Sequence, residues 1–166
     1  MSEPRDGILR LIPTLRRYAR SLSRDHHDAE DLVQDSVEAA LSHLGAWRGA
    51  NMRGWLLTIM TNLHRGRHRR ASSRPRLVEL TEAESIAQPV PVSDPLMRDR
   101  LETAIDLLPP EQRVVLMLVV VEGLTYAEAA TTMGVPLGTV MSRLSRARRA
   151  VAATMNGRNI VGMRNI

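Results

Sequence analysis

The stretch from Thr125 to Arg149 constrains the fold most, because its spacing predicts two short helices joined by a tight turn. Thr125 and Glu128 stand three residues apart, the spacing of a capping box at the start of a helix. Gly134 tolerates the positive φ that a tight turn requires, and Pro136 suits the first position of the next helix. That second helix combines an apolar face with a surface crowded with arginine, namely Arg143, Arg146, Arg148 and Arg149.

This pattern predicts a helix-turn-helix unit that binds DNA. The small Ala130, the glycine Gly134 and the apolar Val140 have the spacing of such units. The alternative is an ordinary helical hairpin with a solvated basic face. The turn, the capping box and the arginine-rich second helix occur together, and their coincidence favours a DNA-binding helix.

Composition narrows the class of protein further. All 23 basic residues are arginine, a good ligand for phosphate, and the net charge is +5. The chain has no cysteine, which excludes disulfides and thiolate metal sites. No apolar run is long enough to cross a membrane, and the first 20 residues carry charges too regularly for a signal peptide. We therefore expect a cytoplasmic protein with no membrane partner.

Charge and proline content divide the chain into two units. Residues 1–76 and 98–166 are basic, whereas residues 77–97 contain acids and no arginine. The proline-rich end of that acidic stretch is typical of an extended linker. The eight apolar residues Val114–Val121 could form a strand, but no partner strand is visible, so we expect a buried helix. The prediction is an all-α fold of two small helical domains, residues 1–76 and 96–154, with a flexible linker (77–95) and a tail (155–166).

Three helices are expected in the first unit. One spans residues 8–22, where Pro13 predicts either a kink or the start of the helix. The second, residues 28–44, has an apolar inward face and an acidic outward face that includes Asp35 and Glu38. Acidic residues in the first turn of a helix are stabilised by the helix dipole. Asp35 and Glu38 lie beyond the first turn, so the dipole does not explain their presence.

The third helix, residues 52–70, becomes increasingly basic along one side. Asn62, Arg65 and Arg69 fall together on that side. In the preceding loop, Trp47 is equally compatible with core packing and with stacking on bases, whereas Trp55 is expected in the core.

Four segments resemble, in the family's order, bacterial sigma factors of the extracytoplasmic-function (ECF) group. They are Asp28–Ser36, Trp55–Arg70, Leu108–Leu118 and Gly123–Val151. The sequence TIMTN at residues 58–62 is similar to the α-proteobacterial general-stress branch. The resemblance implies two all-α domains, regions 2 and 4, that bind core RNA polymerase and direct it to promoters in a stress response. It also implies an anti-sigma factor that covers these surfaces.

The resemblance assigns roles to three sets of residues. Docking on the polymerase β′ clamp helices is implied for Asp28, Glu30, Asp31, Gln34 and Asp35. Recognition and melting of the minus-10 element is implied for Trp47, Arg53, Asn62, Arg65 and Arg69, with residues 47–53 capturing a flipped base. Reading of the minus-35 element is implied for Thr139, Val140, Met141, Ser142, Arg143, Arg146 and Arg149, and docking on the β flap for the apolar helices of region 4. Met141 departs from the family, which often has a basic residue there.

Two other classes of protein are compatible with parts of the sequence. A helix-turn-helix repressor or activator needs only residues 125–149 and leaves the acidic and basic helices of the first unit without a role. A metal site could use His64 with His68, or His26 and His27 with Glu30, but each set lacks a third ligand and the first lies within an arginine run. There is no nucleophile motif, phosphate-binding loop or catalytic carboxylate pair. We expect no enzyme activity, no cofactor and no metal.

Overall fold

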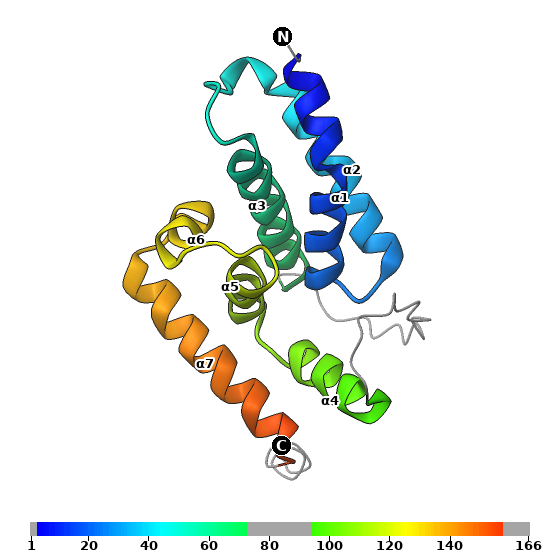
Figure 1. Ribbon diagram of the computed structural model, residues 1–166, viewed down its shortest axis with the longest axis vertical. Coiled ribbons are helices and arrows are strands. Elements are labelled where there is room, and N and C mark those ends of the chain that lie inside the picture. Colours follow the sequence, from blue (N-terminus) through cyan, green and yellow to red (C-terminus); the bar gives the residue numbers. More distant parts are fainter. Residues whose placement is uncertain (1–2, 73–93, 158–166) are drawn as a thin grey trace.

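A computed structural model describes residues 3–72 and 94–157 of the chain (Figure 1). Helices alone make up its regular structure in these residues, as expected for an all-α fold. The elements are α1 (Pro4–Leu22), α2 (His26–Ser42), the 3-10 turn η1 (Leu44–Ala46), α3 (Met52–Ser72), α4 (Pro95–Asp106), α5 (Pro110–Val120), α6 (Tyr126–Met133) and α7 (Leu137–Met155). None of the described helices is long and apolar enough to span a membrane. Residues 77–93 of the expected linker and 158–166 of the expected tail lie outside the described residues.

The first three helices pack on one another around a common apolar core (Figure 1). Leu15, Leu32 and Leu57 are at most 1% exposed, one on each helix. Tyr18 is also buried, and its hydroxyl lies 2.8 Å from Thr61 Oγ1, which satisfies both polar groups. Helix α1 continues through Pro13, so the proline does not begin the helix.

The second unit is organised around α5, whose apolar run is helical as predicted. Val114–Leu118 are buried, whereas Val119 is half-buried and Val120 is 61% exposed. Thr125 Oγ1 accepts a hydrogen bond from Glu128 N at 3.1 Å, and Glu128 Oε2 accepts one from Thr125 N at 2.7 Å, so the capping box is confirmed. Gly134 ends α6 with φ +64°, the left-handed conformation predicted for the turn. Helix α4 packs on α7 and starts at Pro95, capped by Asp94, inside the stretch expected to be linker.

The two units are in contact. Helix α3 packs beside α6, and α1 packs beside α5. The sequence does not predict how the two units are placed relative to each other. The contact brings the basic side of α3 against the helix-turn-helix unit, which decides how the candidate site residues lie.

Candidate nucleic-acid interface

The outer surface of α7 carries most of the residues assigned to the minus-35 element. Met141, Ser142, Arg146 and Arg149 are exposed, and Thr139 is half-buried. Val140, which belongs to the same predicted set, is 0% exposed. The assignment of a DNA contact to its side chain is wrong, because Val140 belongs to the inward stripe that fixes α7 on the core.

Arg143 lies on the same helix but already has a partner. Its Nη1 donates a hydrogen bond to Glu111 Oε2 at 2.8 Å, and both side chains are partly buried. Glu111 stands in the first turn of α5, where its charge also suits the helix dipole. Arg143 therefore differs from its exposed neighbours on α7.

The basic side of α3 divides in a similar way. Asn62 and Arg69 are exposed, as a nucleic-acid contact requires. Arg65 instead reaches the second unit, where its Nε donates to Glu111 Oε1 at 2.9 Å and its Nη1 donates to the carbonyl oxygen of Met133 at 2.6 Å. The same carboxylate thus holds one arginine from each predicted DNA-binding surface.

Arg53, in the first turn of α3, is also paired with a carboxylate. Its Nη2 donates to Glu122 Oε2 at 2.9 Å and to the Glu122 carbonyl oxygen. Trp47 is half-buried, and its indole Nε1 donates to the Ala50 carbonyl oxygen at 3.2 Å, which fixes the ring within the loop. Trp55 packs against the core as expected.

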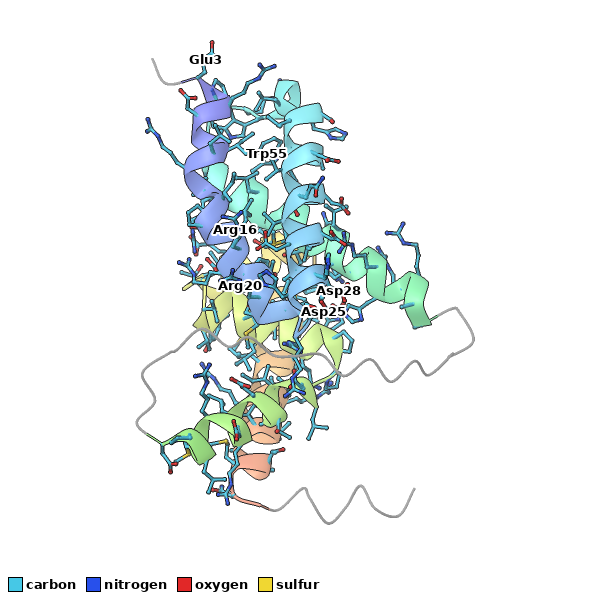
Figure 2. All side chains as sticks on the ribbon, turned by 90° about the vertical axis from the view of Figure 1, so that its right-hand side faces the viewer. Glu3, Arg16, Arg20, Asp25, Asp28 and Trp55 are labelled. Atoms are coloured by element: carbon cyan, nitrogen blue, oxygen red, sulfur yellow. The ribbon has the colours of Figure 1, made fainter. Side chains whose placement is uncertain are left out.

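The acidic face of α2 is open at most of its predicted positions. Asp28, Asp31, Gln34 and Asp35 are exposed, although Asp35 pairs with Arg67 of α3. Glu30 is half-buried, and Arg16 Nε and Arg20 Nη2 of α1 lie 3.4 and 3.9 Å from its carboxylate oxygens. Figure 2 labels these two arginines on α1. Glu30 therefore joins two helices rather than standing free on the outward face.

The two histidines that could form a metal-ligand pair lie close together on α3. The rings of His64 and His68 meet edge-on with centroids 4.5 Å apart. Burial, and then the positive charges of His68 and Arg113, lower the pKa of His64 to about 4. Within residues 3–72 and 94–157 no three acidic or histidine side chains converge as metal ligands would.

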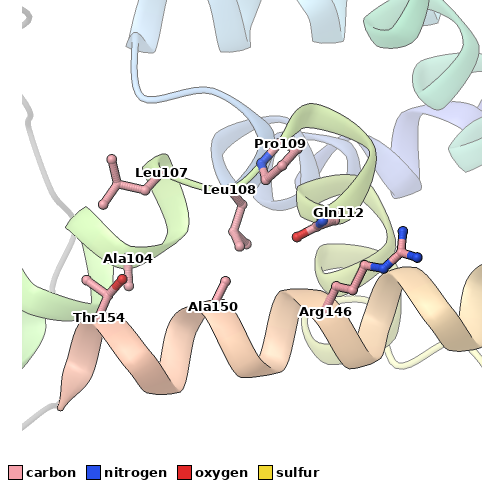
Figure 3. Close-up of a pocket in the computed structure, with 8 residues that line it drawn as sticks. All are labelled: Ala104, Leu107, Leu108, Pro109, Gln112, Arg146, Ala150 and Thr154. Carbon is pink, nitrogen blue, oxygen red and sulfur yellow. The ribbon is translucent and has the colours of Figure 1, made fainter. Parts of the chain in front are cut away.

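A groove in the second unit lies between α4, α5 and α7 (Figure 3). Its lining is mostly apolar and includes Leu107, Leu108 and Ala150, with Arg146 at one side.

Glu111 and Glu122 are the residues that reasoning from sequence missed. Glu122 directly follows the eight apolar residues Val114–Val121, and a charge at the end of a buried run is a signal for a buried ion pair. Glu111 gave no comparable signal, since an acid in the first turn of a helix is common.

Comparison with known proteins identifies the class first. Residues 98–151 match the family "Sigma-70, region 4", and residues 8–61 match "Sigma2 domain of PhyR". ECF RNA polymerase sigma factor EcfG of Rhodopseudomonas palustris is 34% identical over 91% of this chain and 84% of EcfG. ECF RNA polymerase sigma factor SigE of Mycolicibacterium smegmatis is 38% identical over 80% of this chain, which spans about half (54%) of SigE.

Solved structures agree with this class. The sigma factor RpoE in complex with the anti-sigma factor NepR from Bartonella quintana superposes with a TM-score of 0.71, is 28% identical, and covers 94% of this chain and 98% of that chain. CnrH in complex with the cytosolic domain of CnrY superposes with a TM-score of 0.66 at 26% identity, over 92% of this chain and 86% of that chain.

The chain belongs to the ECF RNA polymerase sigma factors, and it is of the α-proteobacterial general-stress type that its TIMTN sequence indicates. Its function as a sigma factor in transcription initiation is thereby confirmed, and the repressor reading is not favoured. Members of this family are not, in general, enzymes.

Proposed function

We propose that this sigma factor uses three helices for three contacts: α2 for core polymerase, α3 for the minus-10 element and α7 for the minus-35 element. The observation that carries the proposal is the separation of charge among these helices. Each buries an apolar stripe, while α2 exposes acids and the other two expose arginines. Regions 2 and 4 would then correspond to residues 1–76 and 96–154.

On α2, the residues proposed to meet the β′ clamp helices are Asp28, Asp31, Gln34 and Asp35, because their side chains are exposed. Glu30 serves the α1–α2 contact first. A surface of this charge steers a basic partner and sets the specificity of docking more than its raw affinity. The groove between α4, α5 and α7 is the proposed docking place for the β flap.

On the DNA side, Asn62 and Arg69 of α3 and Arg146 and Arg149 of α7 are exposed and ready for contact. Arginine forms paired hydrogen bonds with phosphate and with guanine edges, which suits both positioning and base reading. Arg53, Arg65 and Arg143 need to leave their carboxylate partners before they bind DNA.

We further propose that an anti-sigma factor restrains this chain. Of the two similar structures above, RpoE was solved with the anti-sigma factor NepR, and CnrH was solved with the cytosolic domain of CnrY. The proposal applies that class of partner, rather than a particular protein, to this chain.

The decisive experiment compares two double variants in a holoenzyme made with core polymerase. Asn62→Ala with Arg65→Ala should reduce strand opening, read by permanganate reactivity of unpaired thymines, more than closed-complex binding. Arg146→Ala with Arg149→Ala should do the reverse, and should flatten the salt dependence of duplex binding by about one slope unit per phosphate contact removed. Equal effects on duplex binding, with no opening at any promoter, would contradict the proposal.

A further inference from the structure

Glu111 lies between an arginine of each unit and binds both with one carboxylate. Its Oε1 accepts from Arg65 Nε at 2.9 Å, and its Oε2 accepts from Arg143 Nη1 at 2.8 Å. A carboxylate that receives two guanidinium groups has the charge and geometry that a DNA phosphate would offer them. One residue therefore satisfies an arginine from each of the two proposed DNA-binding surfaces.

Glu122 repeats this arrangement a short distance away. Its side chain is 0% exposed, and it accepts from Arg17 Nη2 of α1 and Arg53 Nη2 of the α3 N-terminus, both at 2.9 Å. Arg17 makes a second bond from its Nε at 3.2 Å, so this pairing is bidentate. A buried carboxylate is stable only while such partners remain, and its burial therefore depends on contact between the units.

In the ion pairs between the two units, the first unit supplies the positive charge and the second unit supplies the negative charge. In the part of the chain that the structure describes, four ion pairs join the two units, and in each the arginine belongs to the first unit and the acid to α4, α5 or the loop after α5. The pairs are Arg17–Glu122, Arg24–Asp106, Arg53–Glu122 and Arg65–Glu111. The second unit is basic on α7 but presents its acids to the first unit, so the contact is complementary in charge.

We propose that Glu111 and Glu122 form an internal latch that holds the two regions together and withholds Arg53, Arg65 and Arg143 from promoter DNA. In the latched state Glu111 takes the place of a phosphate between Arg65 and Arg143. Release of the latch is then a step that precedes binding of both promoter elements. This inference rests on the proposed DNA-binding roles of these arginines and deepens them.

The geometry of a promoter requires such a release. Elements centred at minus 10 and minus 35 lie about 85 Å apart along a duplex that rises about 3.4 Å per base pair. Helix α3, assigned to one element, packs directly beside α6 of the helix-turn-helix unit assigned to the other. The latched arrangement therefore cannot engage both elements on one duplex.

The test neutralises the latch in the full chain and compares it with a matched ion pair. Glu111→Gln removes a carboxylate whose side chain is 38% exposed, and Glu102→Gln removes one of the same exposure that pairs with Arg98 inside α4. Both variants lose one negative charge from the second unit. Because the chain has no cysteine, Ser42→Cys on α2 and Ser145→Cys on α7 give two unique positions for spin labels.

Two quantities are measured for each variant. The first is the distance distribution between the labels by double electron–electron resonance. The second is affinity for a fluorescent duplex of random sequence, which rises as the open fraction of the protein rises. We expect Glu111→Gln to lengthen and broaden the distances and to raise affinity about fivefold or more over Glu102→Gln, with a further increase when Glu122→Gln is added.

Each other outcome overturns part or all of the proposal. Identical distances in Glu111→Gln and Glu102→Gln would overturn the latch, even with a gain in affinity, because that gain would then be local neutralisation. Longer distances without a gain in affinity would overturn the masking of DNA-binding arginines. Arg143→Ala in the Glu111→Gln, Glu122→Gln background separates the latch from the proposed function, because Arg143 is released there. Lower affinity than that background supports its DNA-binding role, and unchanged affinity removes that role while longer distances still support the latch.

Discussion

Helices α2 and α7 have the same design on the inside and opposite charge on the outside. Helix α2 buries small and apolar residues such as Leu32 and Val33, and α7 buries Val140 and Leu144. Outward, α2 presents carboxylates and α7 presents arginines. The inward stripe supplies the apolar contacts that place each helix on its core, so the outward charges can differ in sign without changing how the helix packs.

The two outward faces differ in availability as well as in sign. On α2, Glu30 and Asp35 are paired with arginines of α1 and α3. On α7, Arg146, Arg148 and Arg149 are exposed and have no ion pair among the described residues. The surface proposed to bind DNA thus carries cations without an ion pair among the described residues, whereas two of the acids on α2 are partly neutralised by arginines of the same unit.

The largest effect is expected from reversing the charge of α2. Asp31→Arg with Asp35→Arg should weaken core-polymerase binding by more than about 100-fold, since like charges at an interface cost several kcal/mol. Both side chains are exposed, so the helical fold should remain. Asp6→Arg with Asp99→Arg makes the same charge change at exposed positions elsewhere and should bind normally. Retained binding of the α2 variant in a pull-down, with normal circular dichroism, would show that the acidic face has another role.

The second expected effect is a pH dependence of the free energy of unfolding. It concerns the first unit only, because all five histidines lie before residue 69. The pKa of His64 is about 4 in the folded chain, below its ordinary value of 6.5. Between these values the unfolded chain binds a proton that the folded chain does not, so stability falls as pH drops from 6.5 to 4. The loss from this group should reach up to about 3 kcal/mol below pH 4.

Urea unfolding at pH 7.0 and 4.5 measures this loss. His64→Gln should make the free energy of unfolding less dependent on pH, whereas His26→Gln, at an exposed position, should leave the dependence as it is. An unchanged difference between the two pH values in His64→Gln would mean that another group titrates.

The smallest expected effect concerns how the two helices begin. Asp25 caps α2, with its Oδ1 accepting from His27 N at 2.7 Å and Asp28 N at 3.3 Å. Helix α7 has Pro136 at this position and no side-chain cap. Asp25→Ala should lower the free energy of unfolding by about 1 kcal/mol, and Pro136→Ala should lower it by less. Equal urea midpoints for Asp25→Ala and wild type would contradict the capping role.

Local patterns were predictable from the sequence, and contacts between distant residues were not. The capping box of Thr125 and Glu128 and the turn at Gly134 depend on neighbours along the chain, and the structure confirms both. Arg65 and Glu111 are 46 residues apart, and periodicity along one helix does not say which other helix it will meet. The same gap explains Glu30, because its partners lie on α1 and its outward position followed from α2 alone.

Val140 shows a second limit. It belongs both to the apolar stripe of α7 and to the stretch that the family resemblance assigns to DNA, and only its complete burial decides between them. A family motif assigned over consecutive positions of an amphipathic helix therefore includes inward residues that packing removes from contact with a partner.

Helix α4 buries few of its side chains against the rest of region 4. Ala104 is its one buried residue, while Leu96, Met97 and Leu101 are 58%, 48% and 38% exposed. Segments with few buried contacts open locally at low free energy, so the amide hydrogens of α4 should exchange with solvent faster than those of α5 or α7. A partner that covers these side chains would slow exchange there first, which makes α4 a reporter of what docks on region 4.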